Sequence, residues 1–353
     1  MNEIQRVTLG EKPADIVLTG GRVLLPELND FVERDVAIKD DRVASLPRPE
    51  SSSDLIGEET RVIDTEGKTV VPGFIDPHTH IDHQLAFETY YHHALKGGTT
   101  TVITEADAFG LSLGSEGVEG LLDATSDLDI NVLGTVPPQP FFDTFEPQEY
   151  YDKRAFVDLL KNDRIVGVGE SDWIHVVGRD TPAEDLYEAC HDLGKRVSGH
   201  GAGCSGVKLE AFASVIDNDH EAITGEQIVE RVGNGIHAIG RGGSIRDDTR
   251  AVADAYKEIG PDELSLSSDG MWPTDMVEKG YMDFVVRRAI EEGIEPQDAV
   301  RMATLNPARH FKLDGLGSIT PGKRADVVIL ESLESVDVDT VISAGKVVVE
   351  GGE

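Results

Sequence analysis

Cysteine is scarce in this chain, with only Cys190 and Cys204 among 353 residues. Two cysteines are too few for a disulfide framework or a cysteine-rich zinc site. Long apolar runs are absent as well, and no window reaches the roughly 20 residues that a membrane span needs. The first fifteen residues show no basic patch followed by an apolar stretch, so we expect no secretory signal. These shortages predict a cytoplasmic globular protein.

Positive charge is also in short supply. The chain has 32 Lys and Arg residues against 66 Asp and Glu residues, for a formal net charge of −34. Such a surface repels nucleic acid and anionic membranes, so we expect neither as a partner. The acids are scattered, as in Asp40–Asp41 and Asp247–Asp248. This pattern favours a solvated, halophilic coat, because salt screens the self-repulsion; an ordinary acidic cytosolic protein is the alternative.

The two ends of the chain both have the residue pattern of short β-strands. Apolar residues alternate with polar ones in DVAIKDDRVASL near the start, and ADVVILESLESVDVDTVISAGKVVVEG lies near the end. Alternation of this kind, with Gly-Gly and Asp-Asp turns, predicts short strands. We therefore expect a small composite β-sandwich domain formed by residues 1–69 and 317–353.

The middle of the chain, residues 70–316, has a different pattern. Short apolar strands alternate with amphipathic helical segments, and we count eight such strands. This alternation predicts an α/β fold, a (β/α)8 TIM-type barrel. Because barrels of this type carry their chemistry at the carboxyl ends of the strands, polar residues that follow a strand are the site candidates.

The sharpest candidate is the segment PGFIDPHTHID. A strand expected at Val70–Ile75 leads into His78 and His80. Residues two apart on an extended chain point the same way, so both imidazoles can reach one ion.

Metal-competent side chains follow four further strands. RIVGVGE ends in Glu170, KRVSGH in His200 and ELSLSSD in Asp269, while ASVIDN leads into His220. A buried acid at the end of an apolar strand is costly unless it is paired or bound to metal. Each residue alone could be a satisfied polar group. Together they predict one or two divalent ions, Zn, Mn or Fe, held by His78, His80, Glu170, His200, His220 and Asp269.

This order of residues resembles the amidohydrolase superfamily, whose members hold one or two metals at a barrel mouth. Within it, residues 198–227, 241–248 and 282–330 are similar to the adenine deaminases. The resemblance implies that Glu170 bridges two metals where other members use a carbamylated lysine. It also implies that Asp269 both binds metal and shuttles protons, which makes Asp269 and Glu170 the expected catalytic residues.

The chain departs from the adenine deaminases in several places. Those proteins carry a further C-terminal domain, for which this chain has no residues after Glu353. Their Asp-Pro-His-Glu is replaced by residues 105–108 (EADA), and their Glu-Ser-Ser by residues 82–84 (DHQ). We expect these loops to face the substrate, so the resemblance carries over the metal site and leaves adenine specificity open.

Four residues are candidates for substrate binding, each with an ordinary loop or core role as the alternative. His83 and Asp107 lie in the divergent loops, and His175 follows Glu170 by five residues. We place His237 at the end of the seventh strand.

The chemistry predicted from these residues is hydrolytic deamination of an adenine-like or other N-heterocyclic base, with release of ammonia. One alternative is hydrolysis of a cyclic amide or N-acyl bond on the same metals, as in dihydroorotases or hydantoinases. Another is a non-catalytic binding module with a structural metal. The expected partner is a small-molecule substrate, and the sequence leaves a homo-oligomer open.

Overall fold

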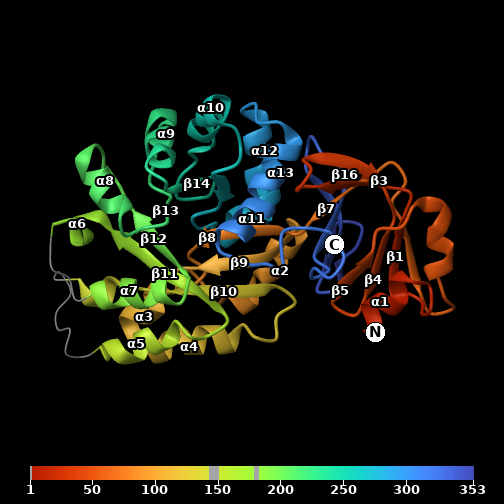
Figure 1. Ribbon diagram of the computed structural model, residues 1–353, viewed down its shortest axis with the longest axis horizontal. Helices are drawn as coiled ribbons and strands as arrows, with labels where there is room; N and C mark the ends of the chain where they lie inside the picture. Colours follow the sequence, from red (N-terminus) through yellow and green to blue (C-terminus); the bar gives the residue numbers. More distant parts are fainter. Residues whose placement is uncertain (1, 143–150, 179–182) are drawn as a thin grey trace.

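The computed structural model describes residues 2–142, 151–178 and 183–353. It contains a barrel and, beside it, a two-sheet unit that holds both chain ends (Figure 1). No helix in these three ranges is long and apolar enough to cross a membrane.

The barrel is a sheet of eight parallel strands in which neighbours in sequence are neighbours in space. The sheet closes between its first and last strands, β8 and β15, where the backbone N of Asp269, two residues after β15, donates to His78 O at 3.0 Å. The (β/α)8 prediction is confirmed. The strands are β8 (Phe74–Thr79), β9 (Thr99–Thr104), β10 (Asn131–Val136), β11 (Ile165–Asp172), β12 (Arg196–His200), β13 (Asn218–Asp219), β14 (His237–Arg241) and β15 (Leu264–Ser267).

Helices surround this sheet, as Figure 1 shows. Helix α10 illustrates why they form, since Ala251, Val252 and Ala255 are buried while Arg250 and Asp254 are exposed. The helices that follow barrel strands are α2 (Tyr91–Lys96), α3 (Asp107–Leu113), α4 (Ser115–Ala124), α5 (Lys153–Leu159), α6 (Trp173–Val176), α7 (Glu184–Asp192), α8 (Val207–Ala213), α9 (Gly225–Gly233), α10 (Thr249–Ile259), α11 (Pro273–Lys279), α12 (Met282–Glu291), α13 (Pro296–Met302) and α14 (Leu305–His310).

The terminal unit consists of two sheets with a shared apolar core. Leu18 and Ile38 from one sheet pack with Val23, Ile329 and Ile342 from the other. The predicted sandwich from both chain ends is confirmed. One sheet has the order β5 (Arg42–Ser45), β4 (Val36–Lys39), β1 (Ile16–Thr19), β6 (Arg61–Asp64); the other has β18 (Lys346–Val349), β17 (Asp337–Ser343), β16 (Val327–Ser332), β7 (Thr69–Pro72), β2 (Arg22–Leu25), β3 (Asp30–Glu33), and helix α1 (Glu3–Thr8) contacts β5.

The boundary between the terminal unit and the barrel falls inside a segment that the sequence predicts as one strand. The strand predicted at Val70–Ile75 is in fact two strands, because β7 pairs with β16 and β2 whereas β8 pairs with β9. Gly73 separates them, and a Cβ at this position would lie 2.2 Å from Thr100 Oγ1. Only glycine allows the chain to pass this close to β9, so the first barrel strand begins at Phe74.

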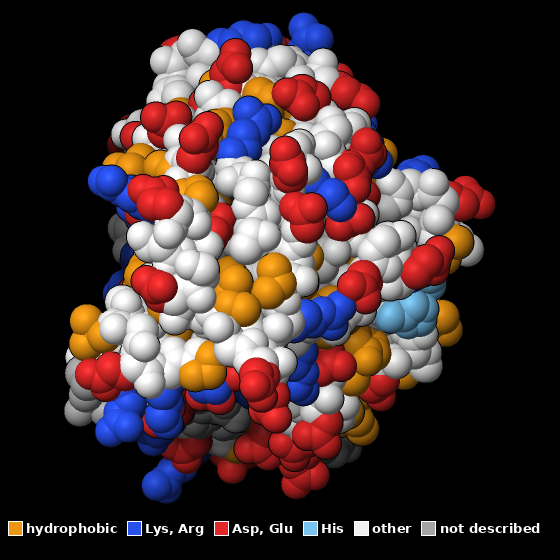
Figure 2. All heavy atoms as spheres, turned by 90° about the vertical axis from the view of Figure 1, so that its right-hand side faces the viewer, with side chains coloured by type: hydrophobic (Ala, Val, Ile, Leu, Met, Phe, Trp, Pro, Cys, Tyr) orange, Lys and Arg blue, Asp and Glu red, His pale blue; other side chains and the backbone are white. Residues whose placement is uncertain are grey.

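Acidic side chains are spread over the surface of the terminal unit. Figure 2 shows Asp and Glu side chains spread over this face, with Lys and Arg between them. Several acids pair with bases, as in Lys39–Asp15 and Arg61–Glu350. The charge is thus dispersed over the surface, as the sequence indicates.

Candidate metal centre

The six residues predicted as metal ligands all lie at the carboxyl ends of barrel strands. His78 and His80 come from the end of β8, Glu170 from β11 and His200 from β12. His220 directly follows the two-residue strand β13. Since parallel strands end at the same edge, residues up to 191 positions apart meet there. Potential ligand atoms of His78, Glu170, His220 and Asp269 all lie within 4.8 Å of one another.

Glu170 lies at the centre of the cluster. Its Oε1 is 3.5 Å from Nε2 of His78 and 3.5 Å from Nε2 of His80. The same oxygen is 3.3 Å from His200 Nδ1 and 3.2 Å from His220 Nε2. Burial alone would raise the pKa of Glu170, but its contacts with His200 and His220 hold that pKa well below its ordinary value. One carboxylate oxygen therefore faces four imidazoles.

Asp269 closes the other side of the cluster. Its Oδ1 lies 3.2 Å from His78 Nε2, and its Oδ2 lies 3.5 Å from Arg241 Nη1. The residue has φ of +55°, a left-handed conformation that is uncommon outside glycine and often marks functional sites. Burial opposes ionisation, yet contact with His78 lowers the pKa of Asp269 to about 2.

The donor set fits a divalent metal. His78 Nε2 and both ring nitrogens of His220 are buried without a hydrogen-bond partner in the described part of the chain. Buried polar atoms are normally satisfied, so these nitrogens need a partner. Imidazole nitrogens and carboxylate oxygens are the ligands that zinc and similar ions take in proteins.

A buried acid from β9 supports this cluster. Glu105 Oε1 lies 3.0 Å from His78 Nδ1, on the side of the ring away from Glu170. Its Oε2 accepts from the backbone N of Glu170 at 2.8 Å and from Thr135 Oγ1 at 3.2 Å. Burial alone would lower the pKa of His78, but the charge of Glu105 and the contact with Asp269 raise it well above its ordinary value. Glu105 thus orients two of the candidate ligands.

Comparison with known proteins identifies the family of this chain. Residues 69–348 match the Amidohydrolase family. The chain belongs to this family.

Among curated proteins, this amidohydrolase is 31% identical over 365 residues to an adenine deaminase of Staphylothermus marinus, with 100% of the chain and 60% of the relative aligned. The chain therefore spans about 60% of the length of that relative. Among solved structures, a β-aspartyl dipeptidase from Fervidobacterium islandicum AW-1 has a TM-score of 0.73 and 20% identity, over 96% of this chain and 98% of that one. An adenine deaminase crystal structure has a TM-score of 0.67 and 17% identity, over 95% and 99%.

The divergent loops of this amidohydrolase also reach the centre. Asp107 Oδ1 lies 3.3 Å from His80 Nδ1 and 2.8 Å from His83 Nε2. Burial would raise the pKa of Asp107, but its contacts with these two histidines lower it strongly. Asp82 accepts from the backbone N of Ala108 at 3.0 Å and so fixes the start of α3. His83 and Asp107 thus lie beside a candidate ligand, at the edge of the cluster.

The position predicted for His237 is wrong. The residue begins β14, so it lies at the end of the barrel opposite the metal centre. There its Nε2 is 2.8 Å from Ser265 Oγ, and its ring stacks on His310 at 4.4 Å. The alternation in GIHAIG identifies the strand correctly but does not fix its start, which explains the error.

His175 lies in α6, directly after the carboxyl end of β11. Its ring is buried and stacks on Phe142, with 4.5 Å between ring centroids. No contact with the six candidate ligands is seen in the described structure. A role in substrate binding stays a prediction for this residue.

The seventh strand contributes Arg241 instead of His237. This arginine is buried at the end of β14, where Nη1 contacts Glu221 and Nε donates to Asp248 Oδ2 at 2.9 Å. Glu221 in turn lies 3.6 Å from His220 Nε2. In the sequence, both residues stand out only as parts of the segments similar to the adenine deaminases. The same Nη1 of Arg241 thus contacts Glu221 and lies 3.5 Å from Asp269 Oδ2.

Proposed function

We propose that this amidohydrolase is a metal-dependent hydrolase of C–N bonds other than peptide bonds, and that it deaminates an adenine-like or other N-heterocyclic base. The observation that carries the proposal is the approach of four imidazoles to one Glu170 oxygen, with Asp269 beside them. The choice of deamination rests on the alignment of the whole chain with an adenine deaminase.

We assign the candidate ligands to two groups around Glu170. His78, His80 and Asp269 would hold one divalent ion, His200 and His220 would hold the other, and Glu170 would contact both. Zn, Mn or Fe bound there would supply Lewis acidity and lower the pKa of water toward neutrality.

Asp269 is the group placed to move protons. One of its oxygens faces His78, and the other faces Arg241 at the mouth. As a carboxylate it would accept a proton from the attacking water and then donate that proton to the departing amine, acting as general base and then general acid. Arg241 positions this carboxylate together with Glu221, so both acids keep a fixed orientation toward the substrate.

The second candidate function is hydrolysis of a cyclic amide or N-acyl bond. One specific observation favours it: Asp107 and His83 form an ion pair at the edge of the centre, in loops that differ from those of the adenine deaminases. A changed loop at the mouth of a barrel changes the substrate while the metal centre stays.

An assay of two product classes tests the proposal. The metal-loaded protein would be incubated in molar KCl with aminopurines, aminopyrimidines, dihydropyrimidines, hydantoins and N-acyl amino acids. Deamination releases ammonia, whereas amide hydrolysis releases a carboxylate. Ammonia from an aminopurine or aminopyrimidine supports the proposal, and a carboxylate from the amides with no ammonia supports the second candidate. Turnover of neither class by fully metallated protein would contradict both.

A further inference from the structure

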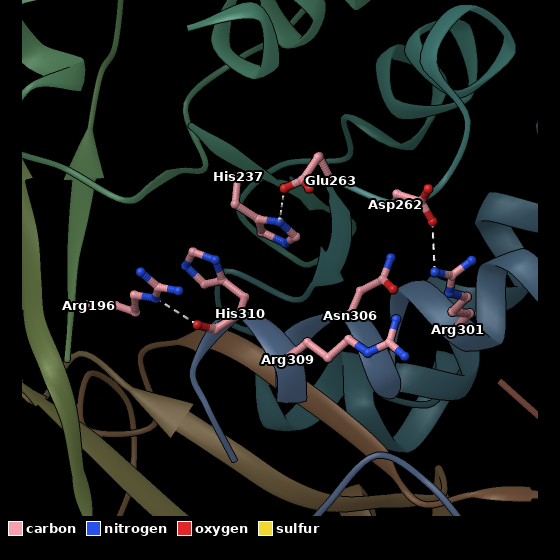
Figure 3. Close-up of a pocket in the computed structure, with 8 residues that line it drawn as sticks. All are labelled: Arg196, His237, Asp262, Glu263, Arg301, Asn306, Arg309 and His310. Carbon is pink, nitrogen blue, oxygen red and sulfur yellow. Dashed lines mark hydrogen bonds and ion pairs between the residues drawn. The ribbon is translucent and has the colours of Figure 1, made fainter. Parts of the chain in front are cut away.

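A second cavity opens at the opposite end of the barrel. It has a volume of about 450 Å³, and all eight residues that line it are polar or charged. Arg196 begins β12 and His237 begins β14, whereas the last residues of these two strands, His200 and Arg241, lie at the metal centre. The cavity is therefore separate from the candidate active site. Figure 3 shows its lining residues, Arg196, His237, Asp262, Glu263, Arg301, Asn306, Arg309 and His310.

Three guanidinium groups face this cavity, and each has donors to spare. Arg309 is exposed, and its side chain makes no hydrogen bond or ion pair with any described residue. Arg301 Nε is buried without a hydrogen-bond partner, although its Nη2 binds Asp262 Oδ1 at 2.7 Å. Arg196 uses Nε on His310 O and Nη1 on Asp217, which leaves Nη2 free among the described residues. Only 32 of 353 residues are basic, so three arginines around one cavity stand out.

Two neutral imidazoles complete the wall. His310 Nε2 lies 2.9 Å from Asn218 Nδ2, so this nitrogen accepts from the amide and the ring proton is assigned to Nδ1. Burial, together with the charge of Arg196, keeps the pKa of His310 well below its ordinary value, and burial also lowers the pKa of His237. The positive charge of the cavity thus comes from arginine, which stays protonated at any ordinary pH.

Two acids at the rim oppose this charge only weakly. Asp262 forms an ion pair with Arg301, and Glu263 contacts the neutral ring of His237, but the two acidic side chains are 73% and 63% exposed. Ion pairs that are this exposed contribute little, so a tighter ligand can displace them. Neither acid is paired with Arg309, whose guanidinium stays available.

We propose that this cavity binds a tetrahedral oxyanion, supplied as inorganic phosphate or as the phosphoryl group of a small ester. Guanidinium forks match such oxygens with two parallel N–H donors each. The all-polar lining excludes an apolar ligand, and the volume leaves room for a small substituent on the phosphoryl group. This site does not depend on the function proposed for the metal centre.

Sulfate is a suitable probe, because it has the same shape and does not precipitate zinc or manganese. Calorimetric titration would use metal-loaded protein at constant ionic strength, with KCl as the replaced salt. The test variant is Arg309→Gln, whose side chain has no partner to lose among residues 2–142, 151–178 and 183–353. The matched control is Arg6→Gln, which removes the same charge from an exposed arginine in α1.

We expect saturable sulfate binding in the parent protein and in the control, and an affinity at least roughly tenfold lower in Arg309→Gln, as loss of a charged hydrogen-bond donor implies. Equal binding in all three proteins would place the anion elsewhere and overturn the proposal, as would no saturable binding at all. Displacement of sulfate by inorganic phosphate and by ribose 5-phosphate distinguishes the free ion from a phosphoryl ester as the ligand. Ribose 5-phosphate binding tighter than inorganic phosphate indicates an ester ligand, and equal or weaker binding indicates the free ion.

Discussion

Nδ1 of His78 lies 3.0 Å from Oε1 of Glu105, while Nε2 of the same ring points at Glu170 and Asp269. A carboxylate behind a metal-binding imidazole fixes the ring and its tautomer. Glu105 is thus part of the candidate metal centre, although it is not one of the six predicted ligands.

Replacing Glu105 with Gln should therefore weaken metal binding without unfolding the protein. The amide keeps the size but loses the charge that orients His78, and such losses lower metal affinity by roughly 10- to 100-fold. Competition with a chelator measures the affinity. Glu58→Gln, at an exposed position in the terminal unit, is the matched control. Unchanged affinity in Glu105→Gln would show that the contact does not support the metal.

Metal stoichiometry tests the central place of Glu170. Six candidate ligands exceed the four that one tetrahedral ion needs, so we expect about two ions per chain. Elemental analysis after reconstitution measures this number. Glu170→Gln should lower it toward one, because the oxygen that contacts all four histidines loses its negative charge. Two firmly bound ions in that variant would remove the bridging role.

The sequence predicts those parts of the site that follow from the position of a residue at the end of a strand, and it misses those that depend on contacts made only in the folded sheet. The six candidate ligands could be found because parallel strands end at one edge, so every polar residue after a strand is brought there. Glu105 obeys the same rule, at the end of TTTVITE, and the rule could have found it. The break at Gly73 depends on Thr100 of the next strand, and no local pattern contains that contact.

The seventh strand shows a different limit. Its alternation fits several starting points, and a shift of four residues exchanges His237 for Arg241 at the metal centre. The pairing of Ala238 with Leu264 fixes the true register, and that pairing is a property of the folded sheet.

Salt should stabilise the protein. With a formal charge of −34, repulsion between surface acids opposes the compact state when salt is dilute. Potassium chloride screens that repulsion within a Debye length that falls to about 3 Å at 1 M. The thermal midpoint should rise as KCl increases from millimolar to molar. A flat profile would leave an ordinary acidic protein as the better description.

The pH dependence of stability should reflect His310. Its folded-state pKa lies well below the ordinary value near 6.5, so the unfolded chain binds the proton more readily. Stability from this group is complete above about pH 6.5. It falls by up to about 1.4 kcal/mol for each pH unit below that value, until the folded pKa is reached. Urea unfolding of parent and His310→Gln protein at pH 7.5 and 5.5 isolates the effect, since the other histidines are common to both. An equal loss in the two proteins would contradict the assignment of a neutral, buried ring.

Ammonia release by the Asp269→Asn variant tests the proposed function most directly. The amide keeps the size and one oxygen that can bind metal, but it cannot accept the proton from water. On a base that the parent protein deaminates, the fully metallated variant should retain its metal while turnover falls by roughly 10²–10⁴, the usual contribution of general acid–base catalysis. Turnover near that of the parent protein, with metal content unchanged, would contradict the role of Asp269 and the mechanism built on it.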